Sequence, residues 1–242
     1  MKIKSELRDL LEINNLLLTL VPEAKFEFKK DGLSVSAVDP SHVAMIVINV
    51  SKDGFLEYSV EEDTEVGIDL DKMKDILKLG SKGDIVDITL EDSRLTYAIG
   101  DLTTSMSTID TSGMSIPKVP ELSLPARAVV PLEDFELALK SAHRFSDHIV
   151  IKITPESFEM YSEGESDATR MVLTKEKVRE IDCEEEVRSI YPIEYLVKLV
   201  KQIDTADFIT VSMSTDYPIK IDFEIVKGHG TASFLLAPRI EE

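Results

Sequence analysis

Apolar residues follow two different spacings along this chain, and the change from one spacing to the other happens four times. In each case apolar residues first recur every three or four positions, as on one face of a helix. Two runs follow in which every second residue is apolar, as on one face of a strand. The pattern predicts four copies of a unit made of a helix, a strand, a short turn and a second strand. The expected helical windows are 1–20, 71–82, 132–145 and 192–204.

The polar residues between the alternating runs mark the turns of these units. The expected turns are Lys30–Gly32, Glu91–Arg94, Pro155–Ser157 and Asp216–Pro218. Further strands are expected at His42–Val50 and Thr169–Thr174. The simplest fold class for this order is α+β. It has two similar domains, each with two helices on one face of an antiparallel sheet.

The middle of the chain breaks the pattern. The segment TSGMSIPKVPELSLP at 111–125 carries three prolines and should run extended, because proline lacks an amide donor and restricts its predecessor. We expect an N-terminal domain at 1–110, a connecting loop at 111–125 and a C-terminal domain at 126–242. A plain linker is one interpretation. The other is a strap that helps to form a groove, since a solvated linker does not need so many apolar side chains: Met114, Ile116, Val119, Leu122 and Leu124.

Two predicted strands have no evident neighbour within the chain. They are Leu102–Asp110 and Ala168–Lys175. An edge strand must be covered or paired. Head-to-tail pairing of these two edges between chains would produce a closed, ring-forming assembly. The ring could be built from identical chains or from related but different ones.

The charge is unevenly distributed. The formal net charge is −19, which taken alone argues against nucleic acid. The four helical windows, however, contain slightly more basic than acidic residues, so the acidity lies on strands and loops. The regular spacing of the basic residues predicts stripes on the exposed faces of the helices, which could be an ordinary solvated surface or a common surface for DNA. Any contact with DNA should be to its phosphates and independent of its sequence. The candidate DNA-facing residues are Arg8, Lys74, Lys78, Lys82, Lys140, His143, Arg144, Lys198 and Lys201.

The sequence lacks the residue patterns that are typical of several functional classes. No apolar run approaches the length of a membrane span, and the N-terminus has no signal-peptide core. A single cysteine, Cys183, excludes an internal disulfide and fits a reducing, cytoplasmic compartment. The four histidines are scattered, so we expect no metal, no cofactor and no catalytic residues.

Four stretches carry a resemblance to a known family. They are DPSHVAM (Asp39–Met45), DLDKMKDILK (Asp69–Lys78), SIP (Ser115–Pro117) and FLLAPRIEE (Phe234–Glu242). In these stretches and over its whole length the chain resembles a PCNA-type DNA polymerase sliding clamp in its archaeal form. The family has two domains of one topology, the DNA-clamp fold, joined by an interdomain connecting loop. Three chains usually form a ring whose helices line a central hole, so the resemblance implies a homotrimer, with a ring of related but different chains as the alternative.

The resemblance also implies a function and a set of partners. A clamp of this kind encircles double-stranded DNA, acts as a processivity factor, is opened by a clamp loader and works at the nucleoid. It tethers DNA polymerase, flap nuclease and ligase through short apolar and aromatic peptide motifs. Leu235 departs from eukaryotic members, which often have an aromatic residue there. The positions that match the family's peptide pocket are Val38, His42, Val43, Met114, Ile116, Pro117, Pro218, Leu235, Leu236, Ala237 and Pro238.

Two other classes of function remain open from the residues alone. One is an acidic adaptor that binds peptides through its groove but does not bind DNA. The other is an enzyme that uses paired carboxylates, for which no motif is present. Assembly into a ring distinguishes the clamp from the adaptor.

Overall fold

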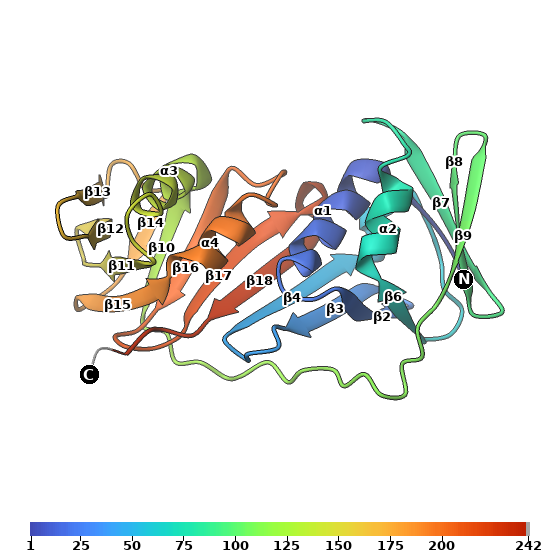
Figure 1. Cartoon of the computed structure of the whole chain (residues 1–242), viewed down its shortest axis with the longest axis horizontal. Helices are drawn as coiled ribbons and strands as arrows, with labels where there is room; N and C mark the ends of the chain where they lie inside the picture. The colour runs from blue at the N-terminus through green and yellow to red at the C-terminus, as the bar shows by residue number, and fades with distance from the viewer. Residues whose placement is uncertain (241–242) are drawn as a thin grey trace. The chain divides into compact units, whose positions relative to one another are not determined.

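The computed structural model describes residues 1–240 and divides into two compact units (Figure 1). The first unit contains Met1–Val119 together with Glu224–Ala232. The second contains Pro120–Phe223 and the segment from Ser233 onward. The last two residues of the FLLAPRIEE stretch, Glu241 and Glu242, lie outside the described residues.

In the first unit, α1 and α2 lie side by side next to two sheets (Figure 1). One sheet has the order β5-β1-β7-β8-β9. The other has the order β6-β2-β3-β4, with the start of β18 next to β4. The elements are β1 (Lys2–Glu6), α1 (Leu7–Leu18), β2 (Glu23–Lys29), β3 (Gly32–Val38), β4 (Ala44–Ser51), η1 (Lys52–Gly54), β5 (Glu57–Ser59), β6 (Thr64–Asp69), α2 (Leu70–Leu77), β7 (Ile85–Glu91), β8 (Arg94–Ile99) and β9 (Leu102–Ser107).

The second unit repeats this arrangement, with α3 next to α4. Its sheets have the orders β14-β10-β16-β17-β18 and β15-β11-β12-β13. The end of β17, all of η2 and the start of β18 belong to the first unit. The elements are β10 (Ala126–Pro131), α3 (Leu132–Ala142), β11 (His148–Ile153), β12 (Ser157–Glu163), β13 (Ala168–Thr174), β14 (Glu180–Asp182), β15 (Val187–Pro192), α4 (Ile193–Val200), β16 (Phe208–Met213), β17 (Ile219–Ile225), η2 (Val226–Gly228) and β18 (Gly230–Leu236).

The predicted fourfold repetition is confirmed, but the repeating unit is larger than expected. A strand precedes each helix directly: β1 before α1, β6 before α2, β10 before α3 and β15 before α4. The expectation of a helix from residue 1 is therefore wrong for Lys2–Glu6. In that strand Ile3 and Ser5 are buried while their neighbours are more exposed, and the strand pairs antiparallel with β7. Lys2 and Lys4 are consequently strand residues.

The other helices end earlier than the windows predict. Helix α2 ends at Leu77, a few residues before the breakers Gly80, Ser81 and Gly83. Lys82 therefore lies beyond the helix, and the four-residue spacing does not place it on a helical stripe. Helices α3 and α4 end at Ala142 and Val200, so His143, Arg144 and Lys201 come just after a helix.

Each unit has its own apolar core beneath its helices. In the first unit Leu16 and Leu17 of α1 are fully buried. In the second, Phe135 of α3 is fully buried and its ring centroid lies 6.3 Å from that of Phe158. Burial of each such side chain stabilises the fold by about 1.5–3 kcal/mol.

Candidate functional site

Basic residues gather at the ends of the helices. Lys78 and Lys201 are the C-cap residues of α2 and α4, and both are exposed with right-handed helical backbone angles. His143 has the same place after α3, and exposed Arg144 follows it. A positive charge is favourable there because the carbonyl end of a helix carries a partial negative charge.

Within the helices, the basic residues are offset by acidic ones. Lys140 pairs with Glu136 at 2.8 Å, and Lys198 pairs with Glu194 at 2.7 Å. The hydrogen bond from Lys198 lowers the pKa of Glu194. With the helices bounded as the structure has them, their basic residues are Arg8, Lys72, Lys74, Lys140 and Lys198. Their acidic residues are Asp9, Glu12, Asp71, Asp75, Glu133, Asp134, Glu136 and Glu194.

The expected excess of positive charge within the helices is therefore wrong. The predicted windows contained more basic than acidic residues only because they included β1 and the segments that follow the helices. The remaining candidates occupy different settings: Arg8 is half-buried among partners on α1, Lys74 is half-buried on α2, and Lys82 is exposed in the turn after α2.

A buried carboxylate organises the loop between β3 and β4. Asp39 is 5% exposed, and one of its oxygens accepts hydrogen bonds from the backbone N–H groups of Val43 and Ala44, both at 2.7 Å. Its other oxygen accepts from the N–H of Ser41 at 3.1 Å. His42 has a φ of 56°, which the closed turn imposes. Asp39 thus fixes the backbone that presents His42 and Val43, although the sequence pattern did not single it out as a site residue.

The connecting segment 111–125 contains no helix or strand. At its start the carboxylate of Asp110 accepts hydrogen bonds from the backbone N–H and the hydroxyl of Ser112, at 2.9 and 2.8 Å. These bonds lower the pKa of Asp110. Met114 and Pro117 are half-buried, while Ile116 is 41% exposed and offers apolar surface.

The remaining predicted peptide-binding positions differ in exposure. Val38 and Val43 are half-buried at the two ends of the Asp39 loop. Pro218 is half-buried in a turn whose Tyr217 carbonyl accepts a hydrogen bond from Tyr191 at 2.8 Å. Leu235 and Leu236 belong to the core, with 5% and 0% exposure, so they offer little surface of their own. Ala237 and Pro238, which follow β18, are half-buried.

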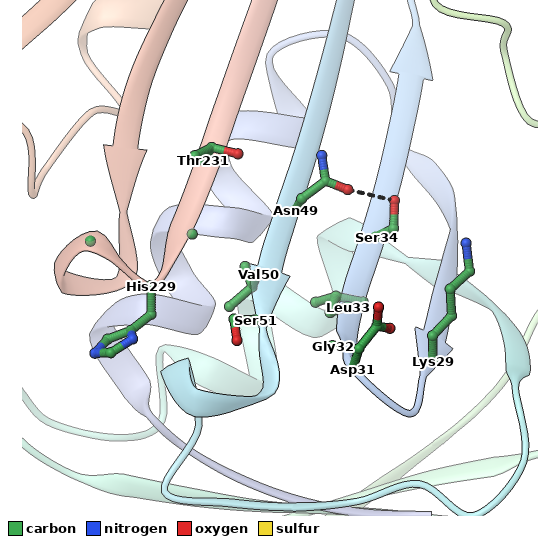
Figure 2. Close-up of a pocket in the computed structure, with 12 residues that line it drawn as sticks. Lys29, Asp31, Gly32, Leu33, Ser34, Asn49, Val50, Ser51, His229 and Thr231 are labelled. Atoms are coloured by element: carbon green, nitrogen blue, oxygen red, sulfur yellow. Dashed lines mark hydrogen bonds between the residues drawn. The ribbon is translucent and has the colours of Figure 1, made fainter.

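No group of three or more potential metal-ligating side chains occurs within residues 1–240. In the same residues no helix is both long and apolar enough to span a membrane. A polar cavity of about 590 Å³ does lie in the first unit, where the start of β3 and the end of β4 meet the residues around His229 (Figure 2). In it the Ser34 hydroxyl donates to the Asn49 side chain at 2.9 Å.

Both halves of the chain match known family profiles. Residues 5–112 match "Proliferating cell nuclear antigen, N-terminal domain", and residues 118–239 match "Proliferating cell nuclear antigen, C-terminal domain". The protein named DNA polymerase sliding clamp of Thermoplasma acidophilum is 36% identical over 244 residues, covering 100% of this chain and 99% of the relative. That of Thermoplasma volcanium is 37% identical over 238 residues, covering 97% of each.

Solved structures agree with these relatives. Archaeoglobus fulgidus PCNA bound to the C-terminal region of FEN-1 superposes with a TM-score of 0.95 at 32% identity, covering 100% of this chain and 99% of that one. PCNA from Thermococcus kodakaraensis superposes with a TM-score of 0.91 at 27% identity, covering 98% and 99%. The chain therefore belongs to the PCNA family of DNA polymerase sliding clamps, whose members are processivity factors and not enzymes.

Proposed function

We propose that this chain forms a homotrimeric ring around duplex DNA and tethers polymerase and other replication enzymes to it. The observation that carries the proposal is a pair of open strand edges, one in each unit. Strand β9 ends one sheet and β13 ends another. Each exposes a large apolar side chain, with Leu102 at 46% and Val172 at 42% exposure.

The repeated topology indicates how these edges are used. In the order of elements, β9 of the first unit corresponds to β18 of the second, and β4 corresponds to β13. Strand β18 begins next to β4, where the Ser51 N–H donates to the His229 carbonyl at 2.9 Å. By the same rule β9 of one protomer would pair with β13 of the next.

The ring gives a role to the domains and to the basic residues. We propose domain boundaries at 1–110 and 126–242, with 111–125 as the connecting loop. The helices would face the DNA, and their basic residues would contact phosphates without sequence preference. The proposed DNA-facing residues remain Arg8, Lys74, Lys78, Lys82, Lys140, His143, Arg144, Lys198 and Lys201.

Partner proteins would bind through short apolar and aromatic segments. The A. fulgidus relative bound to the FEN-1 C-terminal region supports this mode for a flap nuclease. Polymerase, ligase and a clamp loader are the other proposed partners, and replication at the nucleoid in the cytoplasm is the proposed setting. The surface would come from the Asp39 loop, the connecting loop and the two C-terminal segments: Val38, His42, Val43, Met114, Ile116, Pro117, Pro218, Leu235, Leu236, Ala237 and Pro238.

The decisive experiment places a charge on one open edge. Val172→Asp would put an unpaired carboxylate on the edge strand, where the side chains of the partner strand would pack beside it and remove water from it, which costs roughly 2 kcal/mol, or about thirtyfold in association. Sedimentation at micromolar concentration should show a trimer for the native chain and a monomer for the variant, which should also lose polymerase stimulation.

Leu56→Asp is the matched control, because Leu56 is 58% exposed and lies outside both edges. It should remain trimeric and active. A native chain that sediments as a monomer, or a Val172→Asp variant that stays trimeric, would contradict the ring.

A further inference from the structure

The two units end in the same way. After β9, the Ile109 N–H donates to the Gly67 carbonyl of β6 at 2.8 Å. After β18, the Arg239 N–H donates to the Ile190 carbonyl of β15 at 2.7 Å. Since β6 and β15 occupy corresponding places in the two sheets, each unit closes with one backbone bridge to an equivalent edge strand. A cavity lies beside each bridge.

Apart from the bridge, the two cavities are lined by different elements, and they differ in charge. The cavity of the first unit measures about 430 Å³ and is lined by the carboxylates of Glu65 and Asp110, with no basic residue. The cavity of the second unit measures about 910 Å³ and is lined by Arg188, Arg239 and His148, with Glu163 as its carboxylate. We call the second one the basic cavity. It is an exception in a chain whose formal net charge is −19.

The basic cavity opens on the face of its sheet away from the helices. Along β11, Ile149 and Ile151 are buried, and α3 and α4 pack against this strand. His148 and Val150 alternate with them and therefore point to the opposite face. Val150 is the cross-strand neighbour of Tyr161 on one side and of Ile190 on the other.

The cavity also has an apolar side. Its lining includes Val150, Ile190 and Ile240, and Ile240 is 71% exposed. The volume falls in the range of about 300–1,000 Å³ typical of ligand sites. An occupant that brings an apolar side chain would therefore gain burial as well as charge pairing.

The basic groups crowd one another. Nη1 of Arg239 lies 2.8 Å from both ring nitrogens of His148. Arg188 Nε donates to the Tyr161 hydroxyl at 3.0 Å. Arg239 forms no ion pair with any carboxylate of residues 1–240. Burial, then the charge of Arg239, lower the pKa of His148, while Asp147 opposes them.

We propose that the basic cavity binds an acidic segment of a partner protein that carries an apolar side chain. Carboxylates would pair with Arg239 and Arg188, and the apolar side chain would cover Val150 and Ile190. A protein segment fits better than DNA, because the cavity faces away from the helices and has an apolar side. The assignment does not depend on the ring, since every residue involved belongs to the second unit.

The test uses a fluorescein-labelled pentapeptide with a central leucine and two glutamates on each side. A second peptide has lysines in place of the glutamates. Fluorescence anisotropy on the full chain should show saturable binding of the glutamate peptide only. Arg239→Glu should weaken it by about tenfold, through repulsion of the segment. Lys177→Glu is the matched control, because it makes the same charge change on an exposed residue of the second unit outside the cavity, and it should bind normally.

Histidine NMR provides a second readout. The bound glutamates should raise the pKa of His148 relative to the free chain, because they stabilise the imidazolium. The affinity should accordingly increase as the pH falls through the range in which His148, flanked by Arg239, Arg188, Asp147 and Glu163, gains its proton.

Three results would overturn the proposal. The first is equal binding of the two peptides. The second is equal loss of binding in Arg239→Glu and Lys177→Glu. The third is a single-stranded oligonucleotide that binds at Arg239 while the glutamate peptide does not.

Discussion

The first and second units share one topology but fill it with different chemistry. Helices α1 and α3 begin at corresponding residues, so Leu10 corresponds to Phe135 and Asn14 to Leu139. Asn14 is fully buried, its Nδ2 donates to the Leu70 carbonyl at 3.1 Å, and its Oδ1 has no partner among the described residues. Leu139 is fully buried among apolar groups. The comparison teaches that burial and strand pairing maintain this fold, while particular side chains at equivalent sites can change.

The units also differ at one strand edge. The β4 edge of the first unit is next to β18, whereas the corresponding β13 edge of the second is open. The open edge has a charged network beside it. Glu159 on β12 is 6% exposed and accepts from Arg170 of β13 at 2.5 Å and from Ser157 at 3.1 Å. These bonds, with nearby Lys152, outweigh burial and lower the pKa of Glu159. In the proposed ring, the edge that meets the next protomer would therefore be tied to β12 by an ion pair between Arg170 and Glu159.

The largest effect on the free energy of unfolding should come from truncating a buried side chain in the core of one unit only. Phe135→Ala removes a fully buried ring and should destabilise the second unit by about 3–5 kcal/mol. Leu10→Ala, at the equivalent position, should do the same to the first unit by about 2–5 kcal/mol. Hydrogen exchange read by mass spectrometry should localise each loss to its own unit. Uniform loss of protection across both units would show that the cores are not separate.

Asn14 tests whether the chemistry of one unit can be transferred to the other. Asn14→Ala removes the hydrogen bond to Leu70 and should cost about 1–3 kcal/mol. Asn14→Leu copies the second unit and should recover at least half of that loss, because it removes the unpaired Oδ1 and fills the space. Urea unfolding measures both. If Asn14→Leu is the less stable variant, the two helix environments are not interchangeable.

The loops between corresponding strands offer a third comparison. Asp39→Ala removes three hydrogen bonds from the β3–β4 loop and should lower affinity for a partner peptide by about tenfold, mainly by loosening Val43. Asp167→Ala, in the exposed β12–β13 loop, should leave this affinity unchanged. Calorimetry with a FEN-1 C-terminal peptide measures both variants. An Asp39→Ala variant that binds as the native chain does would remove this loop from the proposed peptide surface.

A smaller effect should distinguish the first turns of α1 and α3. Burial, then nearby Glu6, raise the pKa of Asp9 against the opposing charges of Lys227 and Arg8. The folded chain then holds this proton more tightly than the unfolded one. Protonation of Asp9 therefore stabilises the fold fully at pH values below the pKa that Asp9 has in the unfolded chain. This stabilisation is lost as the pH rises through the pKa that Asp9 has in the folded chain. Asp9→Asn should therefore raise the Tm at pH 7. The difference in Tm between the variant and the native chain should become smaller as the pH is lowered toward 3.

Asp134 occupies the equivalent place on α3 and is half-buried. Asp134→Asn should leave the Tm unchanged or slightly lower it, since it only removes a negative charge from a helix start. Thermal melts across pH measure both variants. A lower Tm for Asp9→Asn at pH 7 would mean that the charged form of Asp9 stabilises α1.

The smallest effect concerns the paired C-cap lysines. Lys78→Ala and Lys201→Ala should each reduce retention of the ring on DNA by about two- to threefold. Each should lower the salt slope by up to about 0.9, the value for one phosphate contact. Retention on circular DNA at several salt concentrations measures this, with Lys177→Ala as the control. An effect from one lysine alone would mean that only one unit faces the DNA.

Much of the fold could be predicted because apolar spacing changes sharply where helices give way to hairpins. The strands before the helices were missed because strand runs into helix without a turn, as at Glu6–Leu7 and Asp69–Leu70. With no glycine or proline at these junctions, β1 merged with the α1 pattern. The end of α2 could have been predicted, since Gly80 and Gly83 disfavour a helix. The regular spacing of Lys74, Lys78 and Lys82 instead favoured a helix that continues to Lys82.

The candidate sites were less accessible from sequence. Asp39 in DPSHV carries a known turn signal, an aspartate before proline, yet its burial depends on the finished loop. Arg239, His148 and Arg188 are far apart in the chain and have no common spacing. Only the pairing of β11 with β15, and the bridge from Arg239 to Ile190, bring them to one cavity.

In the proposed ring, β9 of one protomer meets β13 of the next, and these two edges are unlike. An interface between two unlike edges does not by itself limit the number of subunits. Whether a ring closes depends on the rotation that relates one protomer to the next, and a different rotation gives another ring size or an open filament. Within the chain, the β18–β4 contact is tight at Gly230, where a Cβ would come within 2.9 Å of Ile225 and 3.1 Å of the Asn49 carbonyl. A side chain at Gly230 would therefore have to displace β18 or its neighbour β4.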